Sequence, residues 1–298
     1  MTALSNLRVS VAQFPISLDV QANLRHLRAV AEACAGRDLL VVPEGVLSGY
    51  DHDLSFLDRL DRDAFDDAVR QSAEMSREFG LFLIVGTCWP EAGGWSNAAL
   101  GLAPDGERFV YRKVNLAHHE RSGLRAGDRL GVWTVPVRGV DVRIGVQICR
   151  EIRYGEQWRV LARQDAHLFA FLANAVGDRQ MLPVWRAHLI SRAAETQRYV
   201  LAANNAAPEQ KCPTMIVDPK GAVLDEIVSD GRAVAHREID LAAVSSWYLD
   251  QAREDVVQVV CRAPACSSTT RRSSGTSDST PSSSGRTTGR PSLSASSS

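Results

Sequence analysis

The sequence has almost no net charge and few cysteines. Its 298 residues hold 34 lysines and arginines against 35 aspartates and glutamates, so the formal net charge is -1 at pH 7. Composition therefore gives no reason to expect binding to nucleic acid or to an anionic membrane. The six cysteines include no CxxC pair, and we expect neither a disulfide scaffold nor a zinc ribbon.

Long apolar runs are also absent. The first residues, MTALSNLRVSVAQF, have no basic region followed by an apolar core, so no signal peptide is expected. No segment is long enough to span a bilayer. A reducing cytoplasm is the simplest setting for such a chain. What is present is 45% hydrophobic residues, enough for a sizeable core.

Strand patterns alternate with helical patterns along most of the chain, which favours a layered α/β architecture. Apolar residues that alternate, or that form short runs, predict strands at 7–11, 38–44, 81–89, 142–149, 168–174 and 200–205. Apolar residues at helical spacing, with supporting context, predict helices at 20–34, 65–79, 156–162 and 183–199. We expect Pro90 to stop the strand before it.

Hairpin signals lie between these elements. Several short strands with polar turns are expected between Gly93 and Val137, one turn being at 104–106, and 215–227 reads as a hairpin with its turn at 219–221. From Arg262 to Ser298, 20 of 37 residues are serine or threonine. We therefore expect a domain over 1–261 and a disordered tail over 262–298, either natural or the product of a shifted reading frame.

Cys149 ends the run VRIGVQIC, where a strand gives way to a helix. A side chain there is exposed at the carboxyl edge of a sheet, beside backbone N–H groups that are free to stabilise an oxyanion. Cys149 is thus a candidate nucleophile, although free cysteines more often pack in cores. We expect that packing role for Cys34, Cys88 and Cys212.

Two further segments carry candidate residues that are weak signals alone. Glu44 follows the apolar strand in VVPEG, where apolar neighbours would suit a general base. The segment VYRKVNLAHHERSGLRAGD holds Lys113, Glu120 and the pair His118–His119. This histidine pair is a weak metal signal, because neighbouring residues on a strand point to opposite faces. We expect no metal and no cofactor.

Taken together, the segments VVPEG, YRKVNL and ICREIRYGE resemble the nitrilase superfamily of carbon–nitrogen hydrolases, in its order of glutamate, lysine and cysteine. ERSGLRAGD, WRAHLISRAAETQRYVLAANNA and TMIVDPKGAVLDE extend the resemblance over roughly residues 7 to 250. It implies a four-layer αββα sandwich, usually a homodimer or higher homo-oligomer. The nearest branch is that of the amidases.

The resemblance assigns a role to each candidate. Glu44 is the implied base, Lys113 and the backbone N–H of Arg150 are the implied oxyanion donors, and Glu120 supports Lys113. The implied activity is hydrolysis of a small-molecule amide to a carboxylic acid and ammonia through a thioester on Cys149. Apart from the resemblance, Arg153 and Asn174 are candidate substrate-binding residues, since an arginine near the motifs could bind a substrate carboxylate.

Departures from the family pattern bear on the substrate. Arg150 stands where many relatives have an aromatic residue, Gly155 where proline is common, and Cys212-Pro213-Thr214 replaces a frequent glycine and serine arrangement. Arg121 and Arg125 also lie near the motifs, where a carboxylate-binding role competes with ordinary surface salt bridges. The motifs leave open which amide is used.

Other functions remain open at this stage. A nitrilase or an N-carbamoyl amide hydrolase would use the same three residues, but the segment after Cys149 lacks the tryptophan and glutamate common in nitrile-cleaving relatives. A binding or regulatory protein on the same fold, without turnover, is the alternative of another class. A redox-sensing thiol is a third reading of Cys149, and it leaves Glu44 and Lys113 unexplained.

Overall fold

The computed structural model describes residues 6–259. The expected boundary at residue 261 and the Ser/Thr-rich segment after it lie outside these residues. None of the helices within 6–259 is long and apolar enough to cross a membrane.

Residues 6–259 form two six-stranded sheets of mixed direction. The first sheet has the order β12-β1-β2-β3-β4-β5, and the second has the order β11-β10-β9-β8-β7-β6. The strands of the first are β1 (Asn6–Gln13), β2 (Leu39–Val41), β3 (Phe82–Glu91), β4 (Gly94–Leu102), β5 (Arg108–Arg112) and β12 (Ala233–Asp240). Those of the second are β6 (Val132–Val137), β7 (Val140–Ile148), β8 (Leu168–Ala173), β9 (Tyr199–Asn204), β10 (Thr214–Val217) and β11 (Val223–Ile227).

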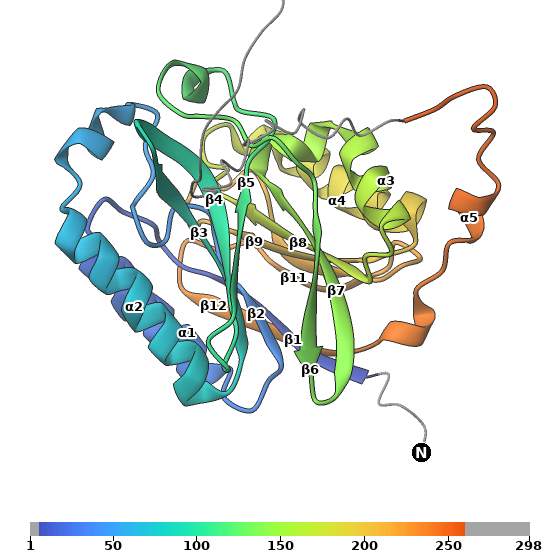
Figure 1. Cartoon of the computed structure of the whole chain (residues 1–298), viewed down its shortest axis with the longest axis horizontal. Helices are drawn as coiled ribbons and strands as arrows, with labels where there is room; N and C mark the ends of the chain where they lie inside the picture. Colours follow the sequence, from blue (N-terminus) through green and yellow to red (C-terminus); the bar gives the residue numbers. More distant parts are fainter. Residues whose placement is uncertain (1–5, 260–298) are drawn as a thin grey trace, which may run out of the picture. The chain divides into compact units, whose positions relative to one another are not determined.

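The longer helices cover the outer faces of the two sheets (Figure 1). Helices α1 (Val20–Ala33) and α2 (Arg62–Phe79) pack on the first sheet, and α3 (Gly155–Arg163) and α4 (Leu182–Thr196) pack on the second. A third apolar core, with members such as Val9, Ile84, Val146 and Leu172, fills the space between the sheets. The four-layer αββα sandwich that the motifs implied is therefore confirmed.

The remaining elements are short. The 3₁₀ helices are η1 (Leu54–Arg59), η2 (His119–Ser122), η3 (Cys149–Arg153), η4 (Arg179–Met181) and η5 (Leu241–Ala243), and α5 is a single turn (Trp247–Asp250). Local sequence explains where the longer helices begin. The side chains of Asp19 and Asp61 accept backbone N–H bonds at the first turns of α1 and α2, and Gly80 ends α2 in the left-handed conformation.

Several expected boundaries are wrong. The strand expected over 38–44 is only β2, Leu39–Val41. Pro90 does not stop its strand, because β3 continues to Glu91 and Pro90 pairs with Trp95 on β4. Strand β2 pairs with β3 only as far as Ile84, so Pro90 has β4 on one side alone, where a missing N–H is tolerated. The helix expected over 183–199 ends at Thr196, since Gln197 adopts a left-handed conformation with φ 55°.

Strand direction brings distant residues to one edge of the sandwich. Strands β2 and β3 are parallel, and β5 runs antiparallel to β4, which is itself antiparallel to β3. The chain therefore leaves β2 and β5 at the same edge. Glu44 follows β2 and Lys113 follows β5. In the second sheet, β7 and β8 are parallel, and Cys149 and Asn174 follow them.

Candidate active site

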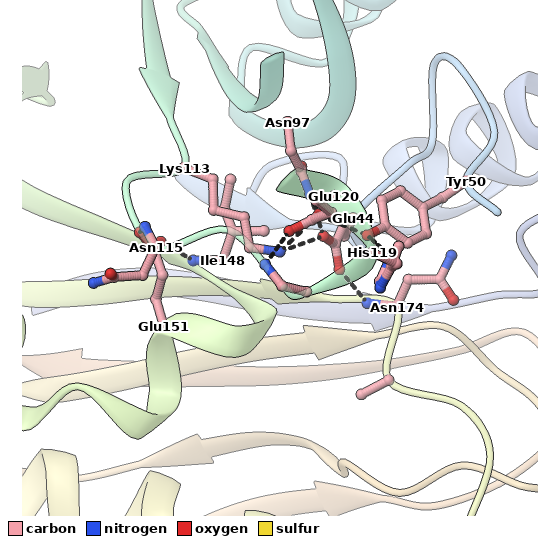
Figure 2. Close-up of polar contacts among 12 residues, drawn as sticks. Glu44, Tyr50, Asn97, Lys113, Asn115, His119, Glu120, Ile148, Glu151 and Asn174 are labelled. Atoms are coloured by element: carbon pink, nitrogen blue, oxygen red, sulfur yellow. Dashed lines mark hydrogen bonds and ion pairs between the residues drawn. The ribbon is translucent and has the colours of Figure 1, made fainter. Parts of the chain in front are cut away.

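The carboxyl edges of the two sheets meet at a buried group of charged side chains (Figure 2). Glu44, Lys113 and Glu120 are each 0% exposed. The ammonium Nζ of Lys113 donates to Glu120 Oε1 at 2.9 Å and to Glu44 Oε1 at 3.3 Å. One buried cation thus lies between two buried carboxylates.

Each carboxylate is also satisfied by neutral donors. Asn97 Nδ2 donates to Glu44 Oε1 and to Glu120 Oε1, both at 2.6 Å. The hydroxyl of Tyr50 donates to Glu120 Oε1 at 2.6 Å, and the backbone N–H of Ala117 donates to Glu120 Oε2 at 2.5 Å. These bonds offset the large cost of removing charged groups from water.

Glu44 also links the two sheets. Its Oε2 accepts the backbone N–H of Asn174 at 2.7 Å, and its own N–H donates to the carbonyl of Ala173 at 3.4 Å. The turn that carries Glu44 packs against Gly86 of β3, where a Cβ would come within 2.4 Å of Glu44 Cα. Only glycine leaves enough room for this approach. The position of the carboxylate thus depends on both sheets.

The charges in the group stabilise one another. Burial lowers the pKa of Lys113, but the charges of Glu44, Cys149 and Glu120 act in the opposite direction, and the net result is a raised pKa. Burial raises the pKa of Glu120, but Lys113 and the hydrogen bonds lower it, so this pKa ends below its ordinary value. At neutral pH, Lys113 is therefore an ammonium and Glu120 a carboxylate.

Cys149 is the first residue of η3, directly after β7, and its side chain is partly buried. Its φ of 47° lies in the left-handed region, which costs a residue with a Cβ of order 1 kcal/mol or more. Burial and then the negative charge of Glu44 raise its pKa to about 12, while Lys113 opposes this shift. The resting group is a thiol, so reaction requires a base.

The other predicted residues are placed differently. Arg150 is exposed and lies in the first turn of η3, where a backbone N–H has no intrahelical partner. Arg153 contacts α4 and not the charged group, with Nη1 2.9 Å from His188 Nε2 and its guanidinium over the ring of Trp185. Asn174 lies at the site, but its side-chain Oδ1 already accepts a bond from Asn205.

Three other cysteines within residues 6–259 have the packing role expected of them, and the histidine pair is not on a strand. Cys34, Cys88 and Cys212 are each 0% exposed and pack in apolar cores. His118 and His119 lie at the start of η2, not on a strand. Within residues 6–259, no group of three or more histidine, cysteine or acidic side chains is arranged to hold a metal ion.

Sequence reasoning missed Asn97 and Tyr50. Asn97 sits on β4 between Ser96 and the apolar run AALGL, and a polar residue next to an apolar strand run is the only local signal of its role. His119 Nε2 lies 3.1 Å from the Tyr50 hydroxyl. Because the single proton of Tyr50 is donated to Glu120, the imidazole Nε2–H of His119 donates to Tyr50.

We expect Tyr50→Phe to lower the free energy of unfolding by about 1.5–3 kcal/mol, the usual worth of a hydrogen bond to a charged group. The change removes the Tyr50 donor from the buried Glu120 carboxylate and leaves the ring in place. Urea unfolding measures the effect. Tyr154→Phe, at a partly exposed side chain, is the matched control. Equal stability of the two variants would show that the Tyr50 bond contributes nothing.

A buried ammonium between two carboxylates, with a partly buried thiol at the edge of the same sandwich, has the residue types of a hydrolase active site. The chain belongs to the carbon–nitrogen hydrolase family, because the model described as "Carbon-nitrogen hydrolase" matches residues 8–249. This confirms the membership that the motifs implied and places the chain in a family of hydrolases.

Individual relatives agree with this assignment. An (R)-stereoselective amidase of a Pseudomonas species is 31% identical over 229 residues, covering 74% of this chain and 81% of the amidase. The omega-amidase YafV of Escherichia coli K12 is 25% identical over 247 residues, covering 81% and 93%.

Solved structures show the same fold. An amidase of Nesterenkonia AN1 from the nitrilase superfamily has a TM-score of 0.72 at 22% identity, covering 84% of this chain and 95% of its own. The Caenorhabditis elegans NitFhit protein has a TM-score of 0.77 at 20% identity, covering 87% and 68%.

Proposed function

We propose that this enzyme hydrolyses small linear amides to a carboxylic acid and ammonia through a thioester on Cys149. The observation that carries the proposal is the buried ammonium of Lys113 held between two carboxylates. Cys149 is partly buried in a strained backbone conformation, and the charges of Glu44 and Lys113 shift the pKa of its thiol. Such a group can remove a thiol proton and stabilise an oxyanion without exposure to water.

In the first half-reaction, Glu44 takes the proton of the Cys149 thiol while the sulfur attacks the amide carbonyl carbon. The carbonyl oxygen becomes an oxyanion. Lys113 has three N–H donors, of which the two carboxylates engage two. The third, together with the backbone N–H of Arg150, is available to the oxyanion.

The first half-reaction ends when the tetrahedral intermediate collapses and Glu44 passes its proton to the amide nitrogen, which leaves as ammonia. In the second half-reaction Glu44 takes a proton from a water molecule, whose oxygen attacks the thioester carbonyl carbon. Glu44 then returns that proton to the departing Cys149 sulfur, so the acid and the free thiol are released. Glu120 keeps Lys113 protonated and in place through its 2.9 Å bond. Arg153 and Asn174 remain candidates for binding the substrate, Asn174 being the one that lies at the charged group.

The names of the relatives support an amide over a nitrile. Both an (R)-stereoselective amidase and omega-amidases are among them, although a nitrilase of Pyrococcus abyssi also matches at 26% identity. Directly after Cys149 stands Arg150, where nitrile-cleaving relatives commonly have tryptophan, whereas the glutamate that was expected to be missing is present as Glu151. Hydrolysis of nitriles or of N-carbamoyl compounds is the alternative activity, and a binding protein without turnover is the alternative class.

A substrate panel tests the proposal. Aliphatic amides, ω-amides, the corresponding nitriles and N-carbamoyl compounds are supplied separately, and ammonia, acid and carbon dioxide are measured. We expect ammonia and acid from at least one amide, with kcat/KM at least tenfold above that for its nitrile. Carbon dioxide release from a carbamoyl compound as the preferred substrate would replace the amidase proposal, and no turnover of any compound would favour the binding protein.

We also propose that the enzyme is a homodimer or a higher homo-oligomer located in the cytoplasm. Trp247 and Tyr248, which are 58% and 55% exposed on α5, support self-association, because large exposed aromatic groups are common at protein interfaces. Light scattering on the eluting protein gives the mass, and cell fractionation gives the location. The mass of a single chain would contradict the oligomer.

A further inference from the structure

Glu151 is a buried ionisable residue that the proposed reaction does not use. It lies in η3, two residues after Cys149, and its side chain is 0% exposed. Figure 2 shows it together with Ile148 and Asn115, away from Tyr50 and His119. A buried carboxylate needs several donors to offset its lost hydration, and the donors of Glu151 come from two distant segments of the chain.

The first donor belongs to the segment of the nucleophile. The backbone N–H of Ile148, the residue before Cys149, donates to Glu151 Oε2 at 2.8 Å. Cys149 itself holds a φ of 47°, a conformation that persists only where the surroundings enforce it. The bond from Ile148 therefore anchors the strained turn that presents the thiol.

The second set of donors belongs to the segment of the lysine. The backbone N–H groups of Val114 and Asn115, which directly follow Lys113, donate to Glu151 Oε1 at 2.8 and 3.1 Å. The hydroxyl of Tyr111, two residues before Lys113, lies 2.8 and 2.9 Å from the two oxygens. One carboxylate thus bonds residues on both sides of the lysine and the residue before the nucleophile.

We propose that Glu151 is a positioning residue that sets the place of the Cys149 thiol relative to the ammonium of Lys113. This inference rests on the proposed function. Lys113 and Cys149 follow strands of different sheets. Glu151 joins the backbone just after Lys113, at Val114, to the backbone just before Cys149, at Ile148. In catalysis a misplacement of about 1 Å costs of order a hundredfold in rate, so losing this link lowers turnover even when both catalytic side chains remain.

The carboxylate form is the one that fits these contacts. The neighbours at Ile148, Val114 and Asn115 are backbone donors, and a proton on Glu151 would have only the Tyr111 hydroxyl oxygen as an acceptor. Burial raises the pKa of Glu151 to about 7, against the opposing effect of its donors, including Tyr111, and the charge of Lys113. The pKa of Tyr111 is raised well above its usual value, so it stays a donor. Protonation as the pH falls through about 7 weakens the link.

The test is Glu151→Gln, an isosteric change that points an amide NH₂ at backbone donors. We expect kcat on the best amide to fall about a hundredfold while KM changes less than about threefold. In the wild type we expect the rate to decline below about pH 7 as Glu151 takes up a proton, and Glu151→Gln should lack this part of the decline. Glu107→Gln, at an exposed residue between β4 and β5, is the matched control. Circular dichroism and urea unfolding confirm that each variant is folded.

Two further measurements keep the inference testable. If Glu151→Gln does not fold, Tyr111→Phe removes one donor and leaves the three backbone bonds, and we expect a fall in kcat of about tenfold with KM unchanged. If the wild type hydrolyses no amide, the proposed function fails. The placement of the thiol is then compared in the wild type and Glu151→Gln by the rate at which iodoacetamide alkylates Cys149, measured by mass spectrometry. A folded Glu151→Gln variant with wild-type kcat, pH profile and alkylation rate would overturn the proposal.

Discussion

Replacing Cys149 by alanine is expected to reduce amide turnover to the uncatalysed background, a loss of roughly a million-fold, the scale seen when the nucleophile of a hydrolase is removed. Cys149→Ser should lose nearly as much. A serine hydroxyl is far less acidic than a thiol, and Glu44 must then deprotonate a much weaker acid. Steady-state ammonia release on the best amide of the panel measures both variants.

The fold should survive both changes. The left-handed φ of 47° at Cys149 is equally unfavourable for alanine and serine, so we expect the free energy of unfolding to change by less than about 1 kcal/mol. Cys34→Ala is a control with the opposite expected result. Cys34 is fully buried at the C-terminal end of α1, and its loss should lower stability while activity remains. Turnover by Cys149→Ala would exclude Cys149 as the nucleophile.

Replacing Lys113 by methionine is expected to abolish turnover and to destabilise the protein by about 3–5 kcal/mol, the usual cost of removing one partner from a buried ion pair. The change leaves the carboxylates of Glu44 and Glu120, which Asn97 already joins at 2.6 Å from each, without their cation. One of them must then take up a proton. Urea unfolding and ammonia release measure the two effects separately.

The two effects are separated by a second substitution. In Lys113→Met/Glu120→Gln the amide replaces one carboxylate, so we expect much of the lost stability to return, because only one buried negative charge remains. Turnover should stay at background, since the oxyanion donor is still missing. Recovery of activity along with stability would mean that Lys113 has a structural role only.

Sequence patterns predicted the elements of the sandwich well where the signal was local. Alternation from Val142 to Ile148 predicted a strand with Cys149 at its end, and β7 ends at Ile148 with Cys149 directly after it. The errors fell at boundaries. Pro90 stayed within β3 because pairing with β4 continued past it, and strand pairing is a tertiary property that a single segment does not reveal.

The candidate site was predicted less evenly. The motifs indicated Glu44, Lys113, Glu120 and Cys149. They did not indicate Asn97, which donates to both carboxylates, or Tyr50, which donates to Glu120. Glu151 stands within the motif ICREIRYGE, which gave it no role, and its four donor groups became visible only with the fold. Hydrogen-bond partners far away in the chain leave no periodicity in the sequence.

The sequence by itself determined the order of strands and helices and the residue types that can perform acyl transfer. Only the tertiary structure decided that Glu44, which in isolation looks like an exposed loop residue, is fully buried and bonded to groups from both sheets. The physical reason is that burial and charge depend on what surrounds a side chain. For Glu44 and Cys149 those surroundings come from strands that are distant in sequence and meet at one edge of the sandwich.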